Sequence, residues 1–117
     1  MNKIHVVNKR DHASTDKDFY IGRGSIFGNP YTSKPLDKSK AIYQAESKGE
    51  ALSKYGEMLE AKIESKEKVI VEGLNEMLDA LKQGDIYLVC YCAPKMCHGD
   101  IIKVVLLHSI LKHLMPK

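Results

Sequence analysis

The residues best suited to chemistry are clustered near the end of the chain: Cys90, Cys92, Cys97, His98 and Asp100. Thiol and imidazole groups serve as nucleophiles, general acids and general bases. The pattern indicates that a helix begins close to Cys97, and a thiol at a helix N-terminus tends towards the nucleophilic thiolate. Cys97, His98 and Asp100 are therefore the candidate catalytic residues, and Asp100 could also cap the helix by accepting from its first N–H groups.

Two other interpretations of this cluster stay open. Cys90, Cys92, Cys97 and His98 together have the atoms of a zinc site, which makes zinc a possible cofactor. Their spacing, C-x-C-x4-C-H, is not a common zinc pattern, and two adjacent ligands are awkward to place on one ion. Alternatively, the cysteines are small core residues, as cysteines outside disulfides often are. No other cofactor is predicted.

A second unusual stretch, YIGRGSIFGNPY at residues 20–31, is rich in glycine. Glycines allow the backbone to approach a ligand closely, and successive N–H groups in such loops can form an anion-binding nest. Arg23 could add a bidentate clamp for phosphate or carboxylate. The alternative is a glycine-rich turn between strands. The candidate ligand-binding residues are Gly22, Arg23, Gly24, Ser25, Gly28, Asn29 and Cys92.

The cysteine loop is placed by the elements on either side of it. Residues 86–91, IYLVCY, are apolar on both faces, which is typical of a central strand in a parallel sheet. The helix that begins near Gly99 and Asp100 is apolar almost all round, so we expect it to be deeply packed. Its exposed side is predicted to carry Lys103, Ser109, Lys112 and His113. Open α/β sheets bind ligands where such strands end.

The rest of the chain supplies further strands and two helices. We expect strands at residues 3–8 and 19–21, separated by a solvated surface loop, and a linker at residues 32–40. One helix follows, starting after Ser39 or Ser47. Its apolar stripe consists of Ala51, Leu52, Tyr55, Met58, Leu59 and Ile63. A second helix is predicted over residues 68–83, with Gly84 as its C-cap and a short strand as the alternative at its start.

Composition excludes several classes of protein. The chain has 117 residues, 44% hydrophobic and 28% charged, which fits one globular domain. Three clustered cysteines do not form a disulfide framework, and no run of residues is apolar enough for a signal peptide or a membrane span. We therefore expect a cytoplasmic protein. The net charge of +3 suits an anionic ligand without requiring nucleic acid.

The motifs GRGSIFGNP and CYCAPKMCHGD together resemble an uncharacterised domain family that is common in bacteriophages and also found in bacteria. Most of the chain takes part in this resemblance, and Tyr91 stands where that family usually has tryptophan. The resemblance implies a fold and a site and leaves the reaction open. The second motif is also similar to the end of an uncharacterised Rossmann-like family, in which arginine usually stands at the position of Gly99.

These observations predict a single small α/β domain over residues 1–117, Rossmann-like and three-layered, with a mostly parallel sheet. We expect a pocket between the glycine-rich loop and the cysteine loop. The expected ligand is nucleotide-like: a nucleotide, a nucleoside phosphate or an ADP-ribose-like compound that is bound or processed. The alternatives are a binding protein that sequesters a host nucleotide signal or binds a host protein, and a zinc-stabilised interaction module. Nucleic acid stays open as a partner.

Overall fold

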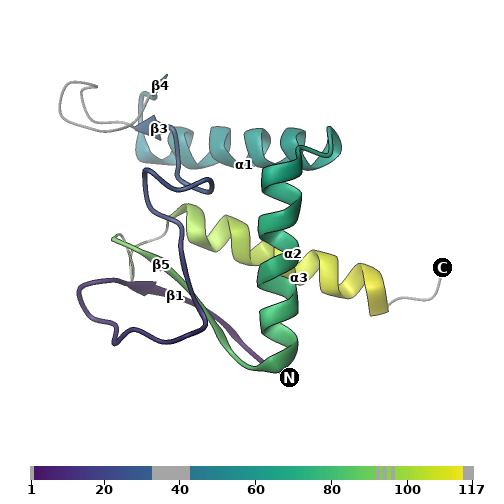
Figure 1. The fold of residues 1–117 in the computed structure, drawn as a ribbon. Helices are drawn as coiled ribbons and strands as arrows, with labels where there is room; N and C mark the ends of the chain where they lie inside the picture. The colour runs from purple at the N-terminus through teal and green to yellow at the C-terminus, as the bar shows by residue number, and fades with distance from the viewer. Residues whose placement is uncertain (1, 33–42, 92, 94, 96, 115–117) are drawn as a thin grey trace.

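The computed structural model describes residues 2–32, 43–91, 93, 95 and 97–114, with side chains as far as Ile110. Figure 1 shows the arrangement of its elements. In chain order they are β1 (Ile4–Asn8), β2 (Asp18–Tyr20), β3 (Tyr31–Thr32), β4 (Tyr43–Gln44), α1 (Lys48–Glu64), α2 (Lys68–Gln83), β5 (Ile86–Cys90) and α3 (His98–Leu114).

The main sheet has the order β1-β5-β2, and both pairings are parallel. Ile4 lies beside Ile86, and Phe19 lies beside Leu88. β5 is the central strand, as its two apolar faces predict. The predicted α/β domain with a mostly parallel sheet is thus confirmed, and the second strand lies one residue earlier than predicted. The sequence did not indicate the short parallel pair of β3 and β4.

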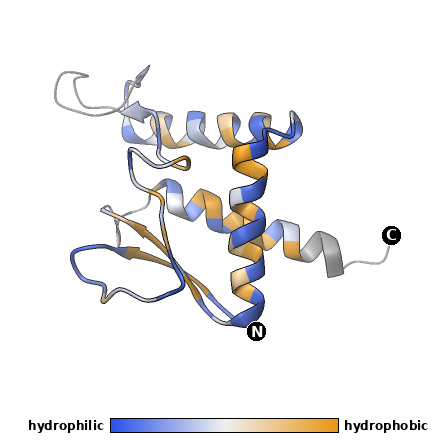
Figure 2. Cartoon of the chain, viewed as in Figure 1, coloured by the Kyte–Doolittle hydropathy of each residue, from blue (hydrophilic) through white to orange (hydrophobic). Residues whose placement is uncertain are grey.

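The described helices pack on one face of the sheet, so the Rossmann-like, three-layered detail of the prediction is not confirmed. On β5 this face carries Ile86, Leu88 and Cys90, and neighbouring strands add Ile4 and Phe19. Figure 2 shows hydrophobic residues along the strands and a polar loop between β1 and β2. The helical side chains of this core are Tyr55 and Leu59 from α1, Ile70, Leu74, Met77 and Leu81 from α2, and Ile102 and Leu106 from α3.

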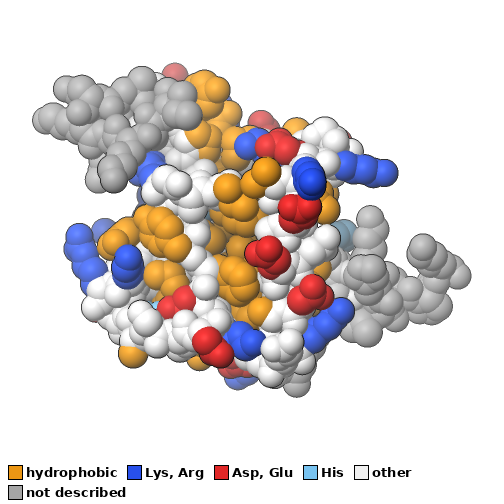
Figure 3. Space-filling view, viewed as in Figure 1, with side chains coloured by type: hydrophobic (Ala, Val, Ile, Leu, Met, Phe, Trp, Pro, Cys, Tyr) orange, Lys and Arg blue, Asp and Glu red, His pale blue; other side chains and the backbone are white. Residues whose placement is uncertain are grey.

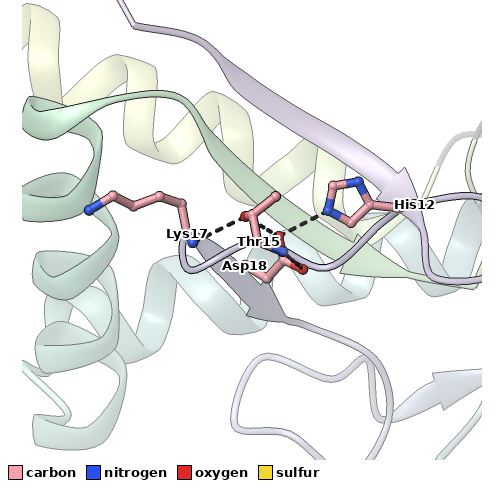
Figure 4. Close-up of polar contacts among 4 residues, drawn as sticks. All are labelled: His12, Thr15, Lys17 and Asp18. Atoms are coloured by element: carbon pink, nitrogen blue, oxygen red, sulfur yellow. Dashed lines mark hydrogen bonds and ion pairs between the residues drawn. The ribbon is translucent and has the colours of Figure 1, made fainter.

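The other face carries Tyr87, and the loop between β1 and β2 supplies the layer over part of it. The His12 ring lies 4.7 Å from the Tyr87 ring, between centroids. His12 Nε2 is 3.0 Å from Asp18 Oδ1, and Thr15 Oγ1 donates to the same oxygen over 2.7 Å (Figure 4). Burial alone would raise the pKa of Asp18, but these hydrogen bonds lower it. The loop is largely exposed, as predicted for a surface loop, and His12 packs one part of it against the sheet.

α1 and α2, the two central helices in chain order, lie where their apolar stripes predict helices. α2 has the predicted bounds, and Gly84 is its C-cap in an extended conformation. α1 begins after Ser47, whose side chain accepts from the Glu50 N–H over 3.1 Å. The alternative cap, Ser39, lies outside the described residues, as does most of the predicted linker.

Replacing Ser47 by alanine should destabilise the protein by about 1 kcal/mol, because the Glu50 N–H loses its side-chain acceptor. Urea unfolding followed by circular dichroism would measure the change. Ser53→Ala is the matched control, since Ser53 is exposed in the middle of α1 and alanine favours a helix there. Equal stability of the Ser47→Ala variant and the wild type would contradict the cap.

The predicted exposed side of α3 was wrong in part. Val104 and Leu107 are 64% and 40% exposed, whereas Lys103 and Ser109 are half-buried. The helix is apolar almost all round, so periodicity could not tell which side faces the core. Lys112 and His113 lie beyond the described side chains. Among the helices described, none is both long and apolar enough to cross a membrane.

Candidate functional site

The two sequence motifs leave the sheet at the same edge. β1, β2 and β5 are parallel, so their carboxyl ends, at Asn8, Tyr20 and Cys90, lie together. The glycine-rich loop, residues 21–30, follows β2, and the cysteine loop, residues 91–97, follows β5 and leads into α3. The sequence predicts this convergence, and this edge is where open α/β sheets bind ligands.

The first turn of α3 is capped by an arrangement that resembles a capping box. Cys97 precedes the helix, and its backbone N–H donates to Asp100 Oδ2 over 3.0 Å. In return, the Gly99 N–H donates to Cys97 Sγ over 3.4 Å. Cysteine thus takes the place that serine or threonine usually holds in this arrangement. The prediction that Asp100 caps the helix is confirmed.

The side chains of Cys90 and Cys97 are buried rather than exposed at the surface. Cys90 and Cys97 are 0% and 2% exposed, and their sulfur atoms are 3.5 Å apart. Cys90 Sγ also donates to the Val7 carbonyl oxygen over 3.5 Å. Cys92, a predicted ligand-binding residue and zinc ligand, lies outside the described residues. Within the described part of the chain, no group of three or more His, Cys, Asp or Glu side chains is placed to hold a metal ion.

His98 joins the two loops. Its side chain is buried, and Nε2 contacts the carbonyl oxygen of Ile21 at the start of the glycine-rich loop. A carbonyl only accepts, so Nε2 carries the hydrogen and donates it. Burial lowers the pKa of His98, the Arg23 charge lowers it further, and the Ile21 carbonyl and Asp100 oppose the shift. His98 is therefore a neutral donor at neutral pH, and its ring contacts the glycine-rich loop.

Gly99 allows this junction to close. A Cβ atom on Gly99 would lie 2.8 Å from both Ile21 Cδ1 and Val6 Cγ1, and 3.3 Å from Cys97 Sγ. A separation of 2.8 Å is too short for two carbon atoms in contact. The helix start can lie against β1 and the glycine-rich loop because this residue has no side chain.

Sequence reasoning missed the role of Tyr55, which supports the glycine-rich loop and the start of α3 from its position on α1. Its hydroxyl donates to the Phe27 carbonyl oxygen over 2.7 Å, and its ring meets the His98 ring edge-on at 5.1 Å between centroids. Burial raises the pKa of Tyr55, and the nearby Cys97 adds to this shift. The available signal was a single hydroxyl in the apolar stripe of α1, which is consistent with an ordinary core residue.

The glycine-rich loop is held together largely by its own polar side chains. Arg23, the predicted phosphate clamp, donates from Nε to the Asn29 carbonyl over 3.0 Å and from Nη2 to the Tyr31 carbonyl over 2.9 Å. Ser25 Oγ donates to the Gly22 carbonyl over 2.6 Å. Asn29 is buried, and its Oδ1 accepts from the Tyr31 N–H over 2.9 Å. Gly24 is exposed and Gly28 is half-buried.

Asn8, which the sequence did not single out, fixes the loop after β5. Its Nδ2 donates to the carbonyl oxygens of Tyr91 and Ala93 over 3.1 and 3.0 Å, and its Oδ1 accepts from the Arg10 N–H over 3.0 Å. The amide therefore couples the loops that follow β1 and β5. An asparagine where a predicted strand meets a polar stretch is a common pattern, so its role was not visible without the fold.

Comparison with known proteins places the chain in a family. A family model described as Domain of unknown function (DUF4326) matches residues 4–108. No curated protein and no solved structure matches the chain. The matched segment contains both loops and the whole main sheet. The chain therefore belongs to the family of the Domain of unknown function (DUF4326).

Proposed function

We propose that the protein binds a small anionic, nucleotide-like ligand at the carboxyl edge of the main sheet. A nucleotide, a nucleoside phosphate and an ADP-ribose-like compound are the candidates. The observation that carries the proposal is the junction of the two motif loops through His98 and Ile21. This junction places the glycine-rich loop beside the N-terminus of α3, and both features favour anions.

The charge near the junction supports an anionic ligand. Arg23 lies close enough to His98 to lower its pKa, and the chain carries a net charge of +3. Arg23 holds the carbonyl groups of Asn29 and Tyr31 with Nε and Nη2, so in this proposal it acts mainly as a fixed positive charge that keeps the loop in shape. The proposed binding residues are the predicted ones: Gly22, Arg23, Gly24, Ser25, Gly28, Asn29 and Cys92.

Burial of the thiol favours binding over processing. Cys97 is 2% exposed, and the His98 Nε2 hydrogen is directed to Ile21. A nucleophile and its base must both reach the reacting atom. If the ligand is processed, Cys97 acts as the nucleophile or as the acid or base, and His98 and Asp100 support it. In the binding form the ligand is retained intact, as in a phage-type protein that sequesters a host nucleotide signal.

The test is to incubate the purified protein with nucleotides, NAD and ADP-ribose, then chromatograph the free and the bound molecules. We expect at least one compound to be retained intact. The Cys97→Ser variant should retain it within about twofold, because serine can replace the thiol as a helix cap. Conversion by the wild type that is lost in Cys97→Ser would instead establish the processing form. If every compound stays free and unchanged, the nucleotide-like ligand is wrong.

The zinc-stabilised interaction module has one observation in its favour. The sulfur atoms of Cys90 and Cys97 are 3.5 Å apart, close to the roughly 3.8 Å that two thiolates on one tetrahedral zinc ion imply. Elemental analysis of protein purified without added metal tests it. Stoichiometric zinc together with loss of the fold in a chelator would establish this form. Metal-free protein with the same melting temperature would reject it.

A further inference from the structure

The second face of the main sheet is partly open, and it carries ring-bearing side chains. Residues in register on this face include His5 beside Tyr87, and Tyr20 beside Val89. None of the described helices packs on this second face, because their core contacts lie on the opposite face, the one that carries Ile86, Leu88 and Cys90 and that we call the Ile86 face. The His5 and His12 rings both lie against Tyr87, which fills the part near the amino ends of the strands. The part near the carboxyl ends stays exposed.

Two tyrosines and two cations form this exposed part, which we call the tyrosine platform: Lys9, Arg10, Tyr20 and Tyr91. Tyr20 and Tyr91 are 43% and 49% exposed, and their rings meet edge-on at 6.3 Å between centroids. Lys9 Nζ lies 5.6 Å from the centre of the Tyr20 ring, and Arg10 Cζ lies 5.9 Å from that of Tyr91. Each ring is therefore paired with a positive charge while much of its surface faces water.

The backbone beneath the platform is fixed in advance. The Lys9 N–H donates to the Cys90 carbonyl over 2.8 Å, and Asn8 Nδ2 donates to the Tyr91 carbonyl over 3.1 Å. The Tyr20 hydroxyl donates to the Arg23 carbonyl over 3.3 Å, which ties its ring to the glycine-rich loop. Binding to such a surface needs little ordering of the backbone, so less affinity is lost to entropy.

The charge around the platform favours an anionic partner. Figure 3 shows basic side chains at the left edge of the molecule, beside the loop between β1 and β2, and acidic side chains along α2. Because α2 packs on the Ile86 face, its acidic residues lie on the far side of the sheet from the platform. Asp11 is an exposed acidic neighbour of Arg10 in the chain, whereas Asp18 and Asp85 are paired with His12 and His5.

We infer that the tyrosine platform binds single-stranded nucleic acid. Bases of a single strand stack on exposed aromatic rings, and cations beside those rings meet the phosphates. A free mononucleotide fits less well, because small ligands bind in concave sites that bury most of their surface and these rings lie on an open face. A strand engages both rings and both cations at once, so several weak contacts add. The platform adjoins the proposed nucleotide-like ligand site, because Tyr91 begins the cysteine loop and the Tyr20 hydroxyl contacts the glycine-rich loop. The strand-binding assay and the ligand-retention assay can nevertheless fail separately.

The test measures fluorescence anisotropy of a labelled 12-nucleotide single strand, as DNA and as RNA, titrated with the full chain at low salt. We expect Tyr91→Ala and Tyr20→Ala each to weaken binding by roughly 5- to 150-fold. Tyr43→Ala is the matched control, because Tyr43 is 52% exposed on β4, away from the platform, and its loss should change affinity by less than about twofold. Lys9→Gln and Arg10→Gln should each remove one phosphate contact. Each should therefore reduce the slope of the logarithm of the binding constant against the logarithm of the salt concentration by about 1.

The outcomes separate stacking from simple charge attraction. Duplex DNA of the same sequence should bind more weakly than the single strand, because its bases are not free to stack on the rings. Equal affinity for the duplex, or unchanged affinity in both tyrosine variants, overturns the inference. The inference is also overturned if the single strand does not bind, whether or not a mononucleotide binds the platform. Circular dichroism confirms that each variant is folded, and Tyr91→Ala alone suffices if Tyr20→Ala perturbs the glycine-rich loop.

Discussion

Gly28→Ala should lower the free energy of unfolding by about 2–3 kcal/mol, because the glycine-rich loop turns back on itself at this residue. A Cβ atom there would lie 2.8 Å from the Gly22 carbonyl oxygen and 2.9 Å from Arg23 Cα. Both are backbone atoms, so neither can swing aside as a flexible side chain would. The loop cannot shift as a unit either, because Tyr55 holds the neighbouring Phe27 carbonyl.

Urea unfolding followed by circular dichroism measures this loss. Gly84→Ala is the control, because a Cβ atom at Gly84 would have no heavy atom within 4 Å and its φ of 172° is ordinary extended backbone. We expect the control to change stability by less than about 0.5 kcal/mol. Similar losses in the two variants would mean that the close approach at Gly28 does not constrain the loop.

The second large effect concerns pH and His98. Burial lowers the pKa of this side chain from its ordinary value of 6.5, so the unfolded chain binds a proton at a pH where the folded protein does not. The contribution of His98 to stability is therefore fully present above about pH 6.5. It is lost as the pH falls from there towards the lowered pKa, because a proton on the buried ring is unfavourable.

Unfolding free energies at pH 8, 7, 6 and 5 would show this loss. In His98→Gln the part of the pH dependence that His98 supplies should disappear. The stability of this variant at pH 8 should also fall by about 1–3 kcal/mol, because the hydrogen bond to the buried Ile21 carbonyl is lost or weakened. His108→Gln is the control, since His108 is exposed on α3. If the His98→Gln and wild-type profiles run parallel, another group is responsible.

The sequence could predict those parts of the fold whose signals are local. β5 is apolar on both faces, and α2 has a clear stripe with a glycine after its last turn, so both were predicted correctly. The convergence of the two motif loops followed from one rule, that parallel strands end at the same edge. That rule needs only the strands and their direction.

Other parts depended on contacts between distant residues. Asn8 and Tyr55 act on loops far along the chain, and neither residue differs in type or spacing from an ordinary strand end or core position. Arg23 had the charge of a phosphate clamp, but its carbonyl partners at Asn29 and Tyr31 are set by the curvature of the loop. The exposed side of α3 could not be predicted, because the helix has too few polar residues to mark it.

The strand order β1-β5-β2 has a consequence for the order of events in synthesis. β1 and β2 do not pair with each other, and each pairs with β5, which begins only at Ile86. A ribosome therefore releases both edge strands long before their shared partner exists. Until that strand emerges, the nascent chain holds the edge strands and the two central helices without a main sheet. Such long-range pairing slows folding and leaves strand edges open to other chains in the meantime.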